Sequence, residues 1–61
     1  MHILLRRIER HLRLSGTPPT NFGREALRDP RFVADLRKGR QPGPSTVRRV
    51  DAYLDRLEQS Q

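Results

Sequence analysis

Apolar residues recur at three- and four-residue spacing in several stretches of the chain, which is the period of an amphipathic α-helix. The first stretch covers residues 2–14, and most of its arginines fall on other faces than its apolar residues. Its apolar positions are Ile3 or Leu4, Leu5, Ile8 and Leu12. No segment sustains the alternation of apolar and polar residues that is typical of a strand. The pattern therefore predicts an all-α protein.

Residues that favour helix ends, in the middle of the chain, predict a short helix over residues 29–38. Asp29 can accept hydrogen bonds from first-turn amides, and Pro30 follows it at a position where a missing N–H costs nothing. Gly39 is suited to end this helix in the left-handed conformation. The expected helix has two to three turns and is rich in arginine.

Two further helices flank this segment in the sequence. Thr-Pro-Pro at 17–19 opens a second helix, whose inward residues are Phe22, Gly23 and Ala26. Two prolines and a glycine keep residues 40–44 non-helical. Ser45 is then expected to cap a fourth helix that runs to about Glu58. Its apolar residues are Val47, Val50, Leu54 and Leu57.

These elements predict one compact four-helix domain over residues 1–58, followed by a frayed tail at 59–61. A chain of this length buries only a small core, so the loss of one large core side chain should come close to unfolding it. The expected core consists of Leu5, Ile8, Leu12, Phe22, Ala26, Val33, Leu36, Val47, Val50 and Leu54.

The charge of the chain indicates a polyanionic partner. Thirteen Lys and Arg face seven Asp and Glu, which leaves a net charge of +6. The excess lies in residues 1–49, with twelve basic and four acidic groups, whereas residues 50–61 hold one Arg and three acids. The first three quarters of the chain are therefore expected to meet nucleic acid. The alternative is that these arginines are simply solvated.

Other classes of function find little support in the sequence. The chain has no Cys, and its two histidines stand apart, so we expect no metal site and no cofactor. Neither a glycine-rich phosphate loop nor a nucleophile beside a base is present, so we expect no enzyme activity. No apolar run approaches the roughly twenty residues of a membrane span. The protein is expected in the cytoplasm, at the bacterial nucleoid.

Residues 17–54 resemble the lambda-repressor-like helix-turn-helix domain of phage and bacterial regulators, also known as the Cro/C1 or xenobiotic-response-element type. The residues that carry the resemblance are Phe22-Gly23, Ala26-Leu27, Val33, Leu36, Gly39, Pro42 or Pro44, Val47, Val50 and Leu54. In that family the small residue, here Gly23, lets the second motif helix cross closely. The turn departs from the pattern, because Leu27 and Arg28 replace the usual glycine and apolar residue. Phe32 is a candidate for the missing apolar contact.

The resemblance implies a sequence-specific regulator of transcription that reads the major groove of double-stranded DNA with helix 29–38. Away from its apolar stripe this helix presents four candidate base contacts, namely Arg31, Ala34, Asp35 and Lys38. Arg31 is the best reader, because its guanidinium can donate two hydrogen bonds to guanine. Asp35 can accept from a cytosine amino group or orient Arg31 one turn earlier, and we favour the orienting role.

Contacts with DNA phosphates are expected on both sides of the reading helix, where they give affinity and register. The candidates are Thr20, Asn21, Arg24, Arg28, Arg37, Arg40, Gln41, Ser45, Arg48 and Arg49. Free amides at the start of the second helix can also face a phosphate.

The fourth helix is expected to pair two copies of the chain. Its apolar stripe is longer than a small core can cover, and Tyr53, Leu54 and Leu57 form the candidate homodimer interface. The alternative is that Tyr53 and Leu57 complete the core of a monomer.

Two other kinds of partner remain open. The domain can be a small helical interaction module of antitoxin or anti-activator type that binds an acidic protein, or it can contact the transcription machinery. Binding of single strands is less favoured, because three aromatic residues make a poor stacking platform.

Overall fold

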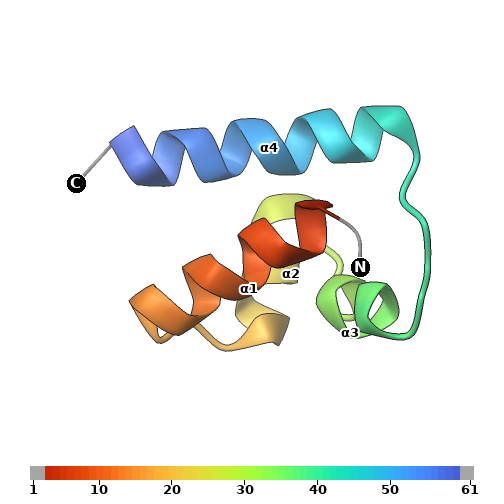
Figure 1. Ribbon diagram of the computed structural model, residues 1–61, viewed down its shortest axis with the longest axis horizontal. Helices are drawn as coiled ribbons and strands as arrows, with labels where there is room; N and C mark the ends of the chain where they lie inside the picture. The colour runs from red at the N-terminus through yellow and green to blue at the C-terminus, as the bar shows by residue number, and fades with distance from the viewer. Residues whose placement is uncertain (1–2, 60–61) are drawn as a thin grey trace.

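Four helices make up residues 3–59, the part of the chain that the computed structural model describes (Figure 1). They are α1 (Ile3–Ser15), α2 (Pro19–Leu27), α3 (Phe32–Arg37) and α4 (Pro44–Gln59). No strand occurs within these residues, so the all-α fold class is confirmed. The expected helix start at His2 and the last two residues of the expected tail lie outside the described residues, whereas Gln59 belongs to α4.

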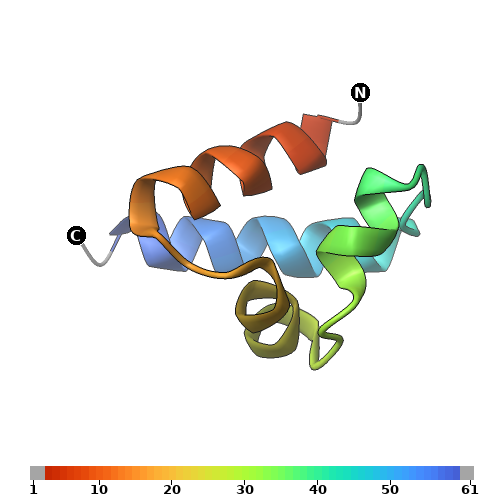
Figure 2. The ribbon, with the colours of Figure 1, turned by 90° about the horizontal axis from the view of Figure 1, so that it is seen from below.

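The helix α4 lies along one side of the molecule, and α1, α2 and α3 pack beneath it (Figures 1 and 2). Both α1 and α2 contact α4, and α3 contacts α1 and α2. The segment between α3 and α4 runs along one end of the molecule from the lower layer to the upper one (Figure 1). The outer sides of α3 and α4 therefore belong to opposite faces.

The core lies where the four helices meet, and among residues 3–59 its apolar side chains are buried to 8% exposure or less. All of the expected members except Val47 are among them, and Val47 packs against their edge. Leu4 and Phe32 are additional members. The buried side chains are Leu4, Leu5, Ile8, Leu12, Phe22, Ala26, Phe32, Val33, Leu36, Val50 and Leu54.

A tight turn joins α2 to α3, and its geometry depends on Gly23. Arg28 lies in the left-handed region at φ 57°, and its amide donates to the Arg24 carbonyl oxygen at 2.8 Å. The amide of Asp29 then donates back to the Gly23 carbonyl oxygen at 3.1 Å. A Cβ on Gly23 would overlap the Asp29 carbonyl oxygen and would stand 3.3 Å from the Cβ of Phe32. The turn can close over α2 because residue 23 has no side chain.

The helix α3 is shorter than the expected range 29–38. The amide of Phe32 donates to the Asp29 carbonyl oxygen at 3.1 Å, which is the three-residue hydrogen bond of a tight turn. Residues 29–31 therefore precede the helix, whose first four-residue bond accepts at the Arg31 carbonyl oxygen. The Asp29 carboxylate accepts the amide of Arg31 at 3.1 Å, but Arg31 still precedes α3, so Asp29 does not cap the helix as expected.

The start of α4 corrects the expected role of Ser45. Pro44 is the first helical residue, and the amide of Val47 donates to the Gly43 carbonyl oxygen at 3.0 Å. Gly43 therefore occupies the capping position, and Ser45 lies one residue inside the first turn. Proline suits that first position, since its absent N–H would have no helical partner.

We expect Gly23→Ala to lower the free energy of unfolding by about 1–3 kcal/mol, because the added Cβ forces the α2–α3 turn outward. Urea denaturation followed by circular dichroism measures this change. Gly43→Ala is the matched control, because a Cβ on Gly43 would meet no heavy atom within 4 Å. Equal effects of the two substitutions would contradict the close approach at Gly23.

Arg28→Gly should raise the free energy of unfolding. A left-handed conformation costs an L-residue about 1–2 kcal/mol, whereas glycine adopts it freely and loses about 0.5–1 kcal/mol of chain entropy on folding. The difference predicts a gain of roughly 0.5–1 kcal/mol. The same denaturation measurement tests it, with Arg24→Gly, in the middle of α2, expected to be destabilising instead.

Candidate nucleic-acid interface

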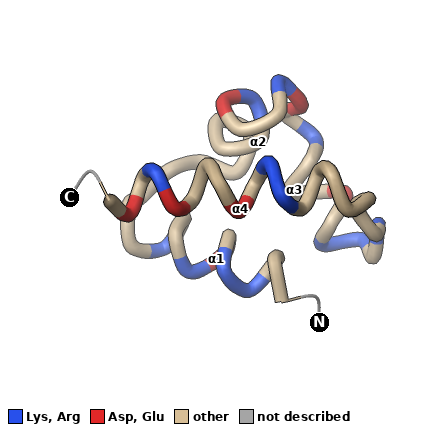
Figure 3. Tube along the Cα trace, turned by 90° about the horizontal axis from the view of Figure 1, so that it is seen from above, with Lys and Arg blue, Asp and Glu red and all other residues tan. Residues whose placement is uncertain are grey.

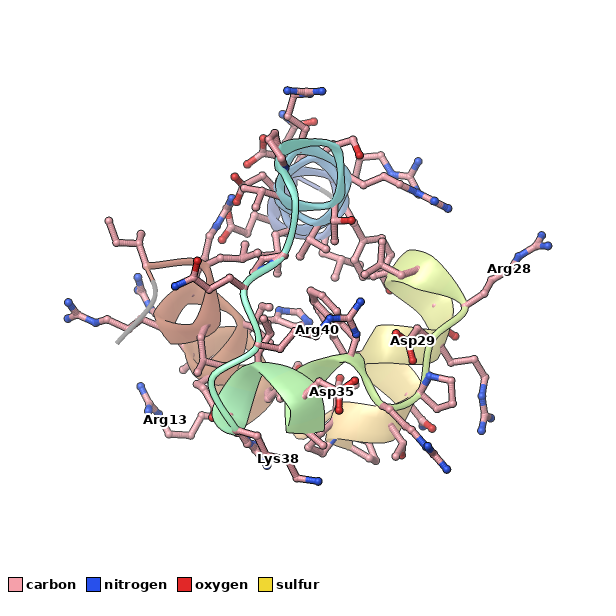
Figure 4. All side chains as sticks on the ribbon, turned by 90° about the vertical axis from the view of Figure 1, so that its right-hand side faces the viewer. Arg13, Arg28, Asp29, Asp35, Lys38 and Arg40 are labelled. Carbon is pink, nitrogen blue, oxygen red and sulfur yellow. The ribbon has the colours of Figure 1, made fainter. Side chains whose placement is uncertain are left out.

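The outer side of α3 carries three of the four candidate base contacts in exposed positions. Arg31, Ala34 and Lys38 are all exposed, while Phe32, Val33 and Leu36 turn into the core. In Figure 4 the Lys38 side chain points away from α4, toward the free side of α3. The structure thus presents these three residues on one open surface.

Asp35 is held differently from what the sequence suggested. Its carboxylate accepts a hydrogen bond from Arg40 at 3.1 Å, and Arg40 also lies 3.7 Å from the Asp29 carboxylate (Figure 4). No side-chain bond joins it to Arg31 among the contacts of the described residues. The chain reverses at Gly39, where φ is 105°, as expected, and this reversal returns Arg40 to the start of α3. Arg40 therefore joins the end of α3 to its start through Asp35 and Asp29, and its phosphate contact stays a prediction.

Arg37, a candidate phosphate contact, is tied to α1. Its guanidinium donates to both oxygens of the Glu9 carboxylate, at 2.8 and 2.7 Å. This bidentate pair holds the pKa of Glu9 below its ordinary value, partial burial opposes the shift, and the nearby charge of Arg13 adds to it. The pair joins α3 to α1, so Arg37 helps to hold α3 against α1.

Ion pairs divide the basic residues into two groups. Arg7, Arg37 and Arg40 together bind six of the seven carboxylates, and the seventh, that of Glu25, accepts a hydrogen bond from Tyr53. The other ten Lys and Arg, all within residues 3–59, form no ion pair. These unpaired cations are Arg6, Arg10, Arg13, Arg24, Arg28, Arg31, Lys38, Arg48, Arg49 and Arg56.

Four candidate phosphate contacts lie on α2 and the turn that follows it. Thr20 and Asn21 are exposed in the first turn of α2, and Arg24 and Arg28 are exposed further along. Arg28 points outward beside α3, as the sequence analysis expected (Figure 4). Gln41 is exposed in the segment that connects α3 to α4.

The candidates on α4 do not share this surface. Val50 is fully buried, and Arg48, two residues before it, lies about 200° around the helix axis. Ser45 and Arg49 are also exposed on the side of α4 that faces away from the core. Because α4 is a separate layer above α3 (Figure 1), Arg48 lies on another face of the molecule than α3, and its phosphate contact stays a prediction.

Sequence reasoning missed the end of α1. Arg13 is exposed there, and Figure 4 shows it on the same lower side of the molecule as Lys38. An open groove runs along α1, and its lining includes Arg6, Arg10, Arg13 and Arg37. The positive charge of α1 was visible in the sequence, but the contact of α1 with α3 through Glu9 and Arg37 is a result of tertiary packing.

The candidate dimer residues serve the core of a single domain. Leu54 is fully buried, so its side chain is not available to a second copy, which corrects its expected interface role. The ring of Tyr53 packs edge-on against Phe22, with 5.6 Å between centroids, and its hydroxyl donates to Glu25 at 3.2 Å. Leu57 is partly buried. The homodimer stays a prediction.

The described part of the chain contains no group of three His, Cys, Asp or Glu residues that could hold a metal ion. None of its helices is both long and apolar enough to cross a membrane. No family model, curated protein or solved structure matches the chain.

We expect stability to fall in acid as the Glu9–Arg37 pair is lost. A carboxylate whose pKa is depressed in the folded state stabilises the fold above its unfolded pKa, about 4.3 for glutamate, and loses this effect as the pH falls through the folded pKa. Glu9→Gln should therefore be destabilising at pH 7 and nearly neutral at pH 2. The Glu9 side chain is 33% exposed, so the effect should stay below about 1 kcal/mol.

Urea denaturation is the suitable measurement, because urea does not screen charge. Arg37→Gln and the double variant complete a thermodynamic cycle. If the two single effects simply add at pH 7, the pair does not contribute to stability.

Proposed function

We propose that this domain binds double-stranded DNA and reads its sequence in the major groove with the outer side of α3. The observation that carries the proposal is the surface formed by Arg31, Ala34 and Lys38. All three are exposed, and both cations lack an ion pair within residues 3–59. A helix with two free cations on its outer side suits a groove whose walls are phosphates and whose floor is base edges.

The surroundings of α3 support this reading. Arg24 and Arg28 are exposed on α2 and in the turn that leads into α3, and neither forms an ion pair within residues 3–59. A duplex that takes α3 into its major groove has a phosphate backbone along each edge of that groove. We propose that these two arginines contact one of the backbones.

The side chains of α3 suggest how bases are distinguished. Arg31 can donate two hydrogen bonds to guanine, and the small Ala34 allows close approach and contact with a thymine methyl group. Asp35 contributes less than the sequence suggested, because its carboxylate is engaged by Arg40. The ion pairs of Arg37 and Arg40 hold α3 in place, which preserves the geometry of any base contact.

The resemblance to lambda-repressor-like domains supports the same function. The close approach of the α2–α3 turn to Gly23 agrees with the role of the small residue in that resemblance, whereas Leu27 and Arg28 depart from the pattern. We therefore propose a role as a regulator of transcription that acts in the cytoplasm at the bacterial nucleoid, where its duplex would be.

Selection of bound sequences from a random duplex pool, followed by quantitative binding, tests the proposal. We expect a preferred site, and we expect Arg31→Ala to lose discrimination at one or two base pairs, about 5–150-fold for the 1–3 kcal/mol of a bidentate base contact. Arg28→Gly removes a charge without backbone strain. It should weaken binding to all sequences alike and reduce the salt slope by about one phosphate contact.

The control is Arg6→Ala, which removes an exposed, unpaired charge from the outer side of α1. If no sequence is enriched, or if Arg31→Ala and Arg28→Gly lower affinity equally on every duplex, α3 does not read bases. Loss of duplex binding in all cases would favour the protein-interaction module instead.

A further inference from the structure

The carboxylates of α4 all face α1, where a single arginine binds them. Arg7 donates to Asp51 at 2.9 Å, to Asp55 at 2.6 Å and to Glu58 at 3.0 Å. These bonds raise the pKa of Arg7 further above its already high value, so its charge is permanent. All three carboxylates of residues 50–61 are therefore engaged in the contact between α1 and α4.

The side of α4 that faces away from the core carries arginines, with the exposed Asp55 at its border about 20° around the helix from Arg48. Ser45, Arg48, Arg49, Ala52 and Arg56 follow one another at helical spacing, and every one of them is exposed. We call this set the outer face of α4. Its three arginines form no ion pair with any residue in 3–59. It presents a charge of +3, although the acids of the same helix equal its arginines in number.

This outer face is out of reach of a duplex that is bound by α3. Ala52 is two residues from both Val50 and Leu54, which are fully buried, so the outer face points directly away from the core. Figure 3 looks down on α4, which lies in front, and shows its basic segments alternating with acidic ones along the helix. The molecule is 22 Å across its shorter axes, whereas the major groove is only about 8.5 Å deep.

We propose that the outer face of α4 binds the phosphates of a second duplex, so that one domain bridges two DNA segments. The bridging rests on the proposed function, which supplies the first duplex at α3. The outer face contains no large apolar residue that could anchor a protein partner, only Ser45 and Ala52 between the arginines. Arg49 and Arg56 are about 10.5 Å apart along the helix axis, so they can meet different phosphates.

A capture assay with the full chain tests the bridge. A duplex that carries the selected site is fixed to beads, and a labelled duplex of unrelated sequence is added with the protein at low salt. We expect the wild type to retain the labelled duplex and Arg49→Gln/Arg56→Gln to retain at least tenfold less. Arg49→Lys/Arg56→Lys keeps the positive charge at the same two positions and should stay within twofold of the wild type.

A third variant, Arg31→Ala/Lys38→Ala, separates this proposal from the proposed function. It should lose preference for the fixed site but still bind the unrelated duplex, with a salt slope of about two to three phosphate contacts from α4. If that residual binding is absent, or if both double arginine variants lose capture equally, the outer face of α4 is not a duplex site. If sequence preference survives in this third variant, α3 does not read the bases. The capture assay with Arg49→Gln/Arg56→Gln then decides whether α4 binds a duplex.

Pairing of two chains through α4 would also bridge duplexes, with two α3 surfaces facing outward. In that arrangement Arg31→Ala/Lys38→Ala abolishes all duplex binding, and sedimentation shows a dimer. Either result would overturn bridging by a single domain.

Discussion

The close approach of the α2–α3 turn to Gly23 is the constraint on which the arrangement of the helices depends. The Asp29 carbonyl lies where a side chain at residue 23 would stand, and this allows the Asp29 amide to reach back to the Gly23 carbonyl oxygen. The same step brings the Phe32 side chain into the core at the first residue of α3. The direction in which α3 leaves the turn, and hence the surface that it presents, follows from this contact.

The ion pairs mainly determine which charged side chains have partners and which remain without one. Arg7 joins α1 to α4, Arg37 joins α3 to α1, and Arg40 closes the end of α3 onto its start. These contacts are partly exposed, so each adds little to stability. Their larger effect is on the distribution of charge, because they gather six of the seven carboxylates around three arginines. The other ten Lys and Arg are left without an acidic partner within residues 3–59, which favours contact with phosphates.

The core supplies most of the stability, and the total free energy of unfolding of so small a domain is low. Phe22, Val33 and Leu54 are essentially inaccessible, and Tyr53 covers Phe22 from the edge of α4. In so small a domain each such side chain is a large share of the total free energy of unfolding. The apolar stripe of α4 is therefore largely used within one copy of the chain, as the burial of Leu54 shows.

The sequence by itself determined the fold class, the approximate extent of the helices and almost the whole core. These features follow from apolar spacing and from Pro and Gly, which act over a few residues and can be read locally. It also identified Gly23 and Gly39 as positions that require glycine. Tertiary structure alone decided which cations remain unpaired, because the partners of Arg7 and Arg37 are 28 or more residues away. It likewise placed α4, with its arginines, in a different layer from α3, since neighbours across helices depend on how the layers pack and not on spacing along the chain.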